Sequence, residues 1–562
     1  MKPIRYTLVF LLFLAGSSQV GNVAPQLPQT PAERVDFQQR GTLYAPMMEY
    51  IYDLEARSDL MHVQKVATTL LGRDIVLVMM SDPPVLNPAD ALRLDRPVVL
   101  IVNNVHGGEY AGKDATLMLM RDLTLGELKP LLKKTMVLIV PTLNPDGAEV
   151  YRRTNEQGFD LNRDYIKLES QEIRGLVTRV INKWQPDIHV DTHHGGSAPY
   201  TLTYQTCLNP ACDPDLVALG NDVIIPRIQK SLRAENYDGF WYSGPSRLGD
   251  QEGWAPTSCE PRKQHTYSGL SNMVGFLFET PSGGYRVMKN GTEVAPVEAK
   301  ERYRHQVRGQ YIGQRELIRF AAEESERLRR TIRLVRQRAI ELGNNDADND
   351  QIVLEYKQES KGNEEFWRQK GWGARRSPGA PPAAPAAEMQ YETVNLPVYT
   401  KFTPTRTTTR PWGYLVPPNL ATIIPLLLDH QISVKRLSEP VEAEVEVYHA
   451  DDVRHREYFQ GHYLVGVKAE KKVERVKLPA GSFFIPAGQP KANLISYLLE
   501  PETDDNLVTW NFLDNYLRVR SAATDRSEDE PAGRPAAAQA AAQRIPIYRL
   551  MKKLPLKGLI VE

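Results

Sequence analysis

Two side chains that could bind a metal ion stand three residues apart at the end of a short apolar segment. Residues 97–105 read PVVLIVNNV and are followed by His106, two glycines and Glu109. A continuous apolar run bounded by glycine is typical of a buried strand, which here would deliver an imidazole and a carboxylate to one point. A loop histidine beside an acid in the first turn of a helix would look the same, so the pair alone is weak evidence for a metal site.

A third candidate ligand lies further along the chain, where residues 187–196 read DIHVDTHHGG. Because side chains alternate along a strand, His189, Asp191 and His193 share one face. We expect His193, beside the Gly-Gly turn, to be the ligand. His189 lies deeper in the strand and is expected to be a core histidine, while His194 points the other way. Two histidines and one glutamate form the donor set of a catalytic zinc site, which keeps a fourth position for water.

Glu279 is the candidate general base. It ends the apolar segment MVGFLFE at residues 273–279, and four of the five residues before it are large and apolar. Burial disfavours the charged form of a carboxyl and raises its pKa, toward the range that suits general-base catalysis near neutral pH. The alternative is an ordinary charge at a strand end, which the apolar neighbours make less attractive.

A cluster of arginine and amide side chains stands between these segments. Residues 144–165 read NPDGAEVYRRTNEQGFDLNRDY and contain the following candidates: Arg152, Arg153, Asp160, Asn162 and Arg163. Guanidinium groups bind carboxylates through two parallel hydrogen bonds. Facing a zinc site, such a cluster indicates an anionic group on the substrate or an oxyanion in the transition state. Solvated surface charge is the alternative for any one arginine.

Strands that alternate with helices must position these residues. The apolar runs predict strands at 97–105, 135–140, 187–192 and 273–279, with a strand pair around Gly72. Amphipathic spacing predicts helices that begin near Tyr44 and at 109–123, 170–184, 216–233 and 294–342. This alternation indicates an α/β fold with a mixed, largely parallel central sheet flanked by helices. Ligands bind such sheets at the carboxyl ends of the strands, where the candidate residues fall.

At 562 residues the chain is longer than one ordinary domain. Its charged start, an apolar run at 8–15 and the small residues that follow are typical of a secretory signal; the run is too short to span a membrane. We expect an exported protein, periplasmic or secreted, with no stable membrane span after cleavage. The expected regions are these: a signal peptide at 1–20, a leader without fixed structure at 21–43, a catalytic domain at 44–345, a charged and Pro/Ala-rich linker at 346–390, and a smaller β-rich accessory domain at 391–562 with a low-complexity loop at 522–544.

Composition excludes some classes of partner. The chain has 69 Lys+Arg against 69 Asp+Glu, so charge gives no reason to expect nucleic acid.

The chain contains three cysteines, Cys207, Cys212 and Cys259, too few for a disulfide framework, and they form no Cys-x-x-Cys pair. A Cys207–Cys212 disulfide is conceivable in an oxidising compartment, and the sequence does not decide it. The sequence is equally silent on the oligomeric state.

Together these segments resemble the zinc metallocarboxypeptidase family, and in particular its secreted bacterial members with a C-terminal extension. The matching motifs occur in the family's order over roughly residues 45–340: His106-Gly-Gly-Glu109, Asn144-Pro-Asp-Gly147, Gly158-Phe-Asp-Leu-Asn-Arg163, Asp191-Thr-His193 and Phe278-Glu279. The resemblance implies a carboxypeptidase A-like fold and one zinc ion per catalytic domain, with peptide or protein C-termini as substrates.

The resemblance also implies a role for each matching residue. His106, Glu109 and His193 would bind zinc, and Glu279 would activate the zinc-bound water and return its proton to the leaving amine. The oxyanion partner would be Arg153, with Arg152 as the alternative. The remaining roles would be as follows: Asn162 and Arg163 hold the substrate's terminal carboxylate, Asp160 orients His106 and Asp191 supports the site from behind, and Tyr267 is the nearest candidate for the family's substrate-binding tyrosine.

Three functions remain open from the sequence. A zinc carboxypeptidase is the leading hypothesis. A zinc amidohydrolase that deacylates N-acyl amino acids or cell-wall peptides would keep the zinc ligands and the base but rearrange the arginines, so the intact Asn162-Arg163 pair favours the peptidase. A binding protein on an inactive scaffold is the third, and the presence of all three ligands with Glu279 argues against it.

Overall fold

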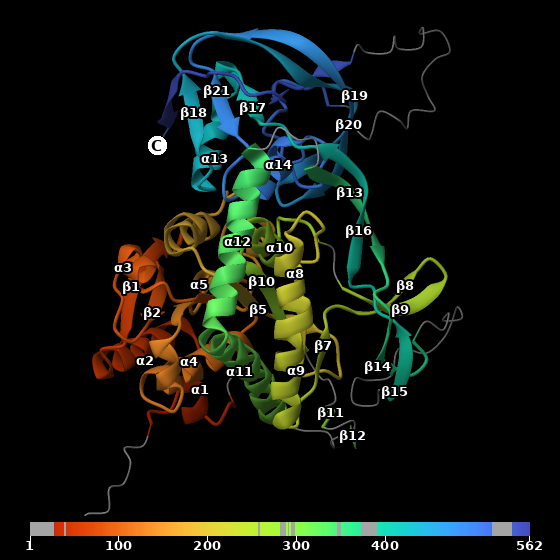
Figure 1. The fold of residues 1–562 in the computed structure, drawn as a ribbon. Helices are drawn as coiled ribbons and strands as arrows, with labels where there is room; N and C mark the ends of the chain where they lie inside the picture. The colour runs from red at the N-terminus through yellow and green to blue at the C-terminus, as the bar shows by residue number, and fades with distance from the viewer. Residues whose placement is uncertain are drawn as a thin grey trace, which may run out of the picture.

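The apolar segments assemble into one twisted sheet with helices on both faces (Figure 1). The computed structural model describes residues 27–38, 41–256, 259–281, 288–289, 292–293, 298–344, 350–372, 390–519 and 542–561. The expected signal peptide lies outside the described residues, as does most of the low-complexity loop. No helix among the described residues is long and apolar enough to cross a membrane.

The central sheet has eight strands, and parallel pairs make up its middle. In spatial order they are β1 (Met61–Thr68), β2 (Asp74–Met80), β4 (Met136–Val140), β3 (Val98–Val102), β5 (Ile188–Gly196), β10 (Val274–Pro281), β6 (Leu202–Thr206) and β7 (Gly239–Trp241). Strands β4, β3, β5 and β10 run parallel to one another. Antiparallel pairing joins β1 to β2, β2 to β4 and β6 to β10. The predicted mixed, largely parallel sheet is therefore confirmed.

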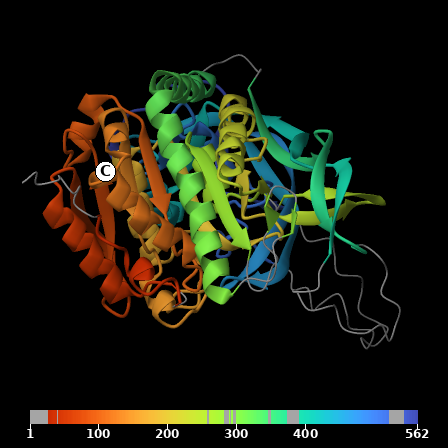
Figure 2. The same ribbon diagram turned by 90° about the horizontal axis from the view of Figure 1, so that it is seen from below.

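The two faces of the sheet bury different sets of apolar side chains. From β3, Val99 and Ile101 pack toward one face, and Leu100 and Val102 toward the other. The first face is covered by α2 (Tyr44–Arg57), α4 (Ala111–Thr124), α9 (Ile225–Ala234) and α11 (Ala299–Glu323). Figure 2 shows α11 lying across it. The second face packs against α6 (Gln171–Gly175), the π-helical turn η3 (Leu176–Ile181), α7 (Asn182–Trp184) and α10 (Gln264–Leu270).

The C-terminal region completes the second face. Its own sheet is antiparallel throughout, in the order β20 (His462–Leu478), β19 (Val441–Phe459), β23 (Tyr548–Leu550), β17 (Gly413–Val416), β21 (Phe483–Pro486), β18 (Val434–Leu437) and β24 (Gly558–Val561), with β22 (Gln543–Arg544) also paired to β19. Helices α13 (Ile424–Asp429) and α14 (Ala492–Leu499) accompany it. Leu420 and Trp510 of this region belong to the same buried cluster as Leu100. The predicted β-rich region is thus present and shares a hydrophobic core with the central sheet.

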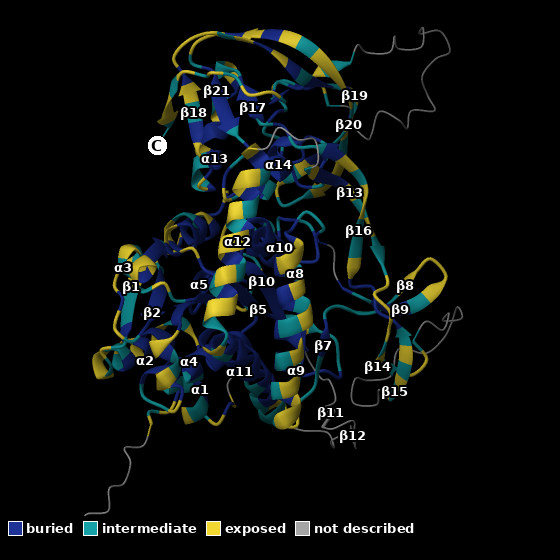
Figure 3. Ribbon diagram, in the orientation of Figure 1, coloured by how far each residue is buried: buried dark blue, intermediate teal, exposed yellow. Residues whose placement is uncertain are grey.

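Two segments differ from their expected lack of structure. In the leader, Thr30 caps α1 (Pro31–Arg34), Ala32 and Phe37 are buried, and Glu33 pairs with Arg121 at 2.7 Å. In the expected linker, β13 (Gln351–Glu359) pairs with β16 (Lys401–Thr409), and β14 (Asn363–Gln369) pairs with β15 (Tyr391–Pro397). Most of the residues of 350–372 are therefore exposed or half-buried on these strand pairs, as the teal and yellow colours of β13 and β14 show in Figure 3.

Several further elements complete the fold. They are α3 (Pro88–Leu94), α5 (Pro145–Glu149), α8 (Pro214–Ala218), α12 (Ser325–Asn344), the pair β8 (Gly244–Leu248) and β9 (Gln251–Ala255), and the pair β11 (Met288–Lys289) and β12 (Thr292–Glu293). The predicted helix at 294–342 is divided between α11 and α12. Cys207 and Cys212 form a disulfide in the loop after β6.

Candidate metal centre

The sheet brings the candidate ligands to one edge. In the β3–β5 pairing Val102 lies opposite Asp191, and in the β10–β5 pairing Glu279 lies opposite His193. His106 follows β3 by four residues. Because β3, β5 and β10 are adjacent and parallel, their carboxyl ends meet, and segments far apart in the sequence converge there.

Asn104 fixes the turn that carries His106 and Glu109. It has a left-handed backbone with φ +53°, and its Nδ2 donates hydrogen bonds to the carbonyls of His106, Gly107 and Glu109, each at 3.0 Å. Gly107 is required because a Cβ there would lie 2.2 Å from the carbonyl carbon of Gly147. The strand-to-helix turn is therefore held by the side chain of Asn104, independently of any metal.

Three ligand atoms form a tight triangle in which no edge exceeds 3.0 Å. His106 Nδ1 lies 3.0 Å from Glu109 Oε2, His193 Nδ1 lies 2.9 Å from the same oxygen, and the two Nδ1 atoms are 3.0 Å apart. All three side chains are almost fully buried. Ligands at tetrahedral positions on bonds of about 2.0–2.1 Å lie about 3.3 Å apart. The donor set and its spacing fit a zinc ion.

A carboxylate holds the far nitrogen of each imidazole. Asp160 Oδ1 lies 2.9 Å from His106 Nε2, and Asp191 Oδ2 lies 2.7 Å from His193 Nε2. Metal-bound histidines commonly donate their other N–H to such a partner, which fixes the ring orientation and strengthens the ligand. The structure therefore brings both expected carboxylates, Asp160 and Asp191, against the far nitrogens of the two imidazoles.

The charges of the site reinforce one another. Burial alone would lower the pKa of His106, but Glu109 and Asp160 outweigh it and raise that pKa above its usual range. His193 is affected likewise, because Asp191 and Glu109 overcome its burial and raise its pKa. In turn the two imidazoles hold the pKa of Glu109 well below its ordinary value against the effect of burial. Glu109 therefore remains a carboxylate, the form that binds a metal.

Glu279 faces this triangle from β10. Burial raises its pKa to about 8, and the charges of His193, Glu109, His106 and Asp191 act on it with opposing signs. Among the described residues its Oε2 atom has no hydrogen-bond partner. A buried carboxyl oxygen without a partner beside a set of metal ligands can accept a proton from a bound water molecule.

Of the two neighbouring arginines, the structure brings Arg153 to the site. Its Nε and Nη2 atoms donate to Asp160 Oδ2 at 3.0 and 2.9 Å, and Nη1 lies 3.4 Å from Glu109 Oε1. Its side chain is still 51% exposed, so one face of the guanidinium remains open. Arg152 points elsewhere and pairs with Glu156.

Asn162 and Arg163 lie on the side of His193. Asn162 is buried, with Nδ2 3.1 Å from His193 Nε2 and Oδ1 accepting a hydrogen bond from the backbone N–H of Gln264 at 2.9 Å. Arg163 is half-buried and donates to the carbonyl of Asn162 at 2.7 Å. The amide of Asn162 is therefore hydrogen-bonded within the protein. The positive charge of Arg163 acts to lower the pKa of Asp160 and the pKa of Tyr242.

Comparisons with known proteins agree with this geometry. A family model described as "Zinc carboxypeptidase" matches residues 47–201, which include all three ligands. "Carboxypeptidase 2" of Trichophyton rubrum is 23% identical over 434 residues, covering 74% of each chain, and "Carboxypeptidase Z" of Mus musculus is 30% identical over 155 residues, covering 24% of this chain and 23% of that protein. The segment that carries the metal ligands is thus similar to zinc carboxypeptidases.

A solved metallo-carboxypeptidase from Pseudomonas aeruginosa, in complex with (2-guanidinoethylmercapto)succinic acid, is 19% identical with a TM-score of 0.38, covering 50% of this chain and 69% of that chain. The match to the zinc carboxypeptidase family model and the ligand triangle support a zinc-dependent metallocarboxypeptidase. Zinc supplies the Lewis acid of such an enzyme.

The tyrosine expected from the zinc carboxypeptidase resemblance does not join the site. Tyr267 is fully buried in α10, and its hydroxyl lies 3.0 Å from His430 Nδ1, in the core shared with the C-terminal region. Its ring packs against Tyr165. Helix α10 covers the second face of the sheet, and this packing directs Tyr267 into the core instead of toward the carboxyl edge.

Tyr242 is the tyrosine that the structure does bring there. Its hydroxyl lies 3.7 Å from the point where a Cβ on Gly195 would stand, and Glu279 Oε2 lies 3.0 Å from that point. Burial raises the pKa of Tyr242, and the charges of Glu279 and Glu109 add to the effect. Tyr242 follows β7, which runs antiparallel to β10. A search for residues at the carboxyl ends of the parallel strands therefore does not predict it.

The other two histidines of β5 stand apart from the metal centre. His189 is fully buried, with Nδ1 2.9 Å from Ser268 Oγ, and burial lowers its pKa to about 3. His194 Nε2 accepts a hydrogen bond from the backbone N–H of Ala111 at 2.9 Å, at the start of α4. A neutral core histidine and a backbone-capping histidine are structural roles.

Proposed function

We propose that this metallocarboxypeptidase removes residues from the free C-termini of peptides, and that His106, Glu109 and His193 hold its single zinc ion. When bound, the ion lowers the pKa of a coordinated water molecule and polarises the scissile carbonyl. The observation that carries the proposal is the ligand triangle with a carboxylate behind each imidazole. Asp160 and Asp191 orient the rings.

Glu279 acts as the general base in this proposal. It takes a proton from the attacking water and later gives it to the leaving amine. Its buried position and the pKa of about 8 support this role, because a base works best when its pKa lies near the operating pH. The position of Tyr242 beside Glu279 supports a hydrogen bond from its hydroxyl to the substrate.

Two arginines divide the recognition of negative charge. Arg153, with one open face beside Glu109, stabilises the oxyanion of the tetrahedral intermediate. Arg163 holds the terminal carboxylate, and Asn162 sets its position, since the side chain of Asn162 is bonded to His193 and Gln264. This division predicts strong discrimination against amidated C-termini.

A product assay tests the function. Purified protein is incubated with matched peptides that carry a free or an amidated C-terminus, and with N-acetyl amino acids, and the released products are identified by mass spectrometry. Release of C-terminal amino acids from the free-acid peptides alone is expected. Equal cleavage of both peptides would remove the clamp role from Arg163, and acetate release would point to a deacylase.

The Glu279→Gln variant tests the mechanism. It should retain one zinc per chain by metal analysis and lose about 100- to 10,000-fold in kcat. Undiminished hydrolysis would remove Glu279 from the mechanism. A His106→Ala variant is the matched control, since it should lose both zinc and activity.

We also propose export. The N-terminal sequence of the chain supports it, as does the Cys207–Cys212 disulfide, because disulfides persist in oxidising compartments. Cell fractionation with N-terminal sequencing of the mature protein checks this; a full-length N-terminus recovered from the cytoplasm would refute it.

A further inference from the structure

The C-terminal region reaches the metal centre through the turn of one hairpin. Strands β19 and β20 are joined by Gln460 and Gly461, whose φ values of +52° and +83° make a tight left-handed turn. The turn lies against the loop that carries Asp160, since a Cβ on Gly461 would stand 3.6 Å from the ring of Phe159. Beside it, His462 Nε2 lies 2.9 Å from Glu169 Oε1.

One side chain of this turn contacts the support of a metal ligand. The backbone N–H of Asp160 donates to Gln460 Oε1 with 2.8 Å between nitrogen and oxygen, across 300 residues of sequence. The carboxylate of the same Asp160 holds His106 Nε2 and receives Arg153. A single residue thus links the accessory sheet to an imidazole ligand and to the arginine beside it.

A second contact holds the other side of the site. Asp505, fully buried in the C-terminal region, accepts hydrogen bonds from the backbone N–H of Arg262 at 2.7 Å and from its Nε at 3.2 Å. The guanidinium of Arg262 lies over the rings of Phe459 and Trp510. Two residues later, the N–H of Gln264 bonds to Asn162 Oδ1. The segment that orients Asn162 is therefore fixed from the same region.

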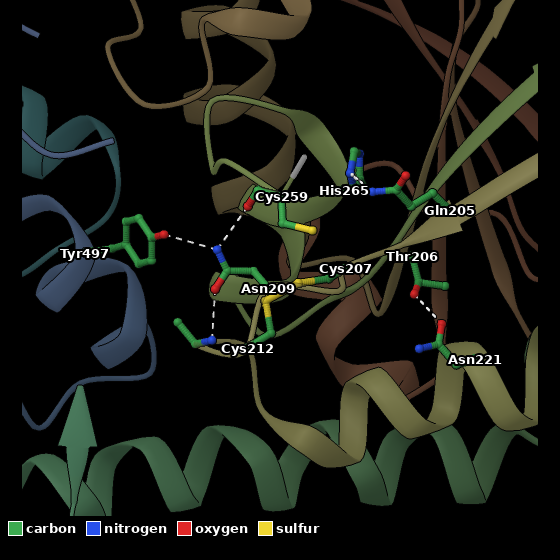
Figure 4. Close-up of a disulfide and its surroundings, with 10 residues drawn as sticks. Gln205, Thr206, Cys207, Asn209, Cys212, Asn221, Cys259, His265 and Tyr497 are labelled. Carbon is green, nitrogen blue, oxygen red and sulfur yellow. Dashed lines mark hydrogen bonds between the residues drawn. A yellow bond between two sulfur atoms is a disulfide. The ribbon is translucent and has the colours of Figure 1, made fainter. Parts of the chain in front are cut away.

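A third contact lies farther from the metal. Figure 4 shows Asn209, in the disulfide loop, donating to the hydroxyl of Tyr497 on α14 and to the carbonyl of Cys259, at 3.1 and 3.0 Å. In α7, just before β5 begins, Asn182 donates to the carbonyl of Asp429 at 2.7 Å and accepts from Lys491 at 2.8 Å. Of these contacts, the Gln460 hydrogen bond is the one made directly to a residue whose side chain holds a metal ligand.

We propose that the C-terminal region helps to position a residue of the metal centre. Gln460 is the positioning residue, and it sets zinc affinity by holding the backbone of Asp160. The inference rests on His106 being a zinc ligand, as in the proposed function. Asp160 contacts His106 through a hydrogen bond of 2.9 Å, so a shift of the Asp160 backbone changes the direction of the ring. Loss of such supporting partners typically weakens metal binding about 10- to 100-fold. Gln460 contacts the supporting residue and not the ligand, so its loss should weaken zinc binding less.

The test compares variants of the full chain. Gln460→Leu keeps the shape of the side chain and removes the acceptor, whereas Gln460→Glu keeps an acceptor oxygen. Asn182→Ala is the matched control, because it removes interface hydrogen bonds far from the metal. Zinc dissociation constants come from competition with a chromophoric chelator, and the thermal midpoint is measured for every metal-free protein.

We expect Gln460→Leu to weaken zinc binding about 3- to 10-fold, and Gln460→Glu to stay within about 2-fold of the parent. Asn182→Ala should lower the thermal midpoint while leaving zinc affinity unchanged. Unchanged affinity in Gln460→Leu, or an equal loss in Asn182→Ala, would overturn the inference. His106→Ala separates it from the proposed function: full zinc binding in that variant would refute the ligand assignment itself.

Discussion

The buried carboxyl of Glu279 should make the metal-free protein less stable as pH rises, and Glu279→Gln should remove that dependence. The pKa of Glu279 is raised to about 8 in the folded chain, against about 4.3 for an unperturbed glutamate. Between these two values the folded state binds more protons than the unfolded state. The free energy of unfolding therefore falls with pH, by up to about 1.36 kcal/mol per pH unit for one proton.

From pH 5 to pH 8 this amounts to about 2 to 4 kcal/mol, once partial titration at each end of the window is included. The glutamine variant cannot ionise and lacks this loss. As pH rises, the variant should therefore become more stable relative to the parent by about that amount. The neighbouring histidines titrate in both proteins, so most of their contribution cancels in the difference.

Urea denaturation followed by tryptophan fluorescence, in the presence of a chelator and at four pH values from 5 to 8, measures this difference. A difference that stays constant within about 0.5 kcal/mol would mean that Glu279 titrates as an ordinary solvated carboxyl, and the argument for a desolvated base would fail. Saturating zinc provides the control. A nearby divalent cation favours the charged carboxylate, so the pH dependence of the difference should shrink when zinc is added.

Three further predictions concern neighbouring groups. Asp160→Asn should weaken zinc binding about 10- to 100-fold, as measured by chelator competition, and unchanged affinity would contradict its supporting role. Arg153→Gln should lower kcat about 100-fold with little change in KM, whereas Arg152→Gln should behave as the parent in the same peptide assay; equal losses would contradict the assignment. Cys207→Ser with Cys212→Ser should cost about 2 kcal/mol of unfolding free energy for so short a loop, and no change in the urea midpoint under oxidising conditions would contradict the disulfide.

The metal centre could be predicted from the sequence because one physical rule places most of it. Parallel strands end at a common edge, and His106, His193 and Glu279 each stand at or just beyond the end of an apolar run. The positions of the main helices and strands could be predicted from the periodicity of apolar residues. Asp160 lies in a loop, and its position against His106 was reached from the resemblance to a family and not from any periodic pattern.

The rest depends on packing that no local pattern encodes. Tyr267 is the nearest candidate in the sequence for the family's tyrosine, but the face of α10 that it occupies turns it into a core shared with the C-terminal region. Tyr242 reaches the site from a strand that runs the other way. Gln460 stands in a polar turn with no motif around it, and its importance comes from the residue that it meets 300 positions away.

The electrostatics of the site explain why its surroundings must be rigid. Three buried carboxylates, Glu109, Asp160 and Asp191, face two imidazoles within about 3 Å. The raised pKa values of His106 and His193 favour the protonated rings when no metal is bound. Zinc binding releases protons from its ligands, so one divalent cation takes the place of up to two bound protons with little change in net charge. That exchange works only where the carboxylates stay in place as the charge moves from the rings to the ion, which is a physical reason for the C-terminal region to hold the Asp160 loop through Gln460.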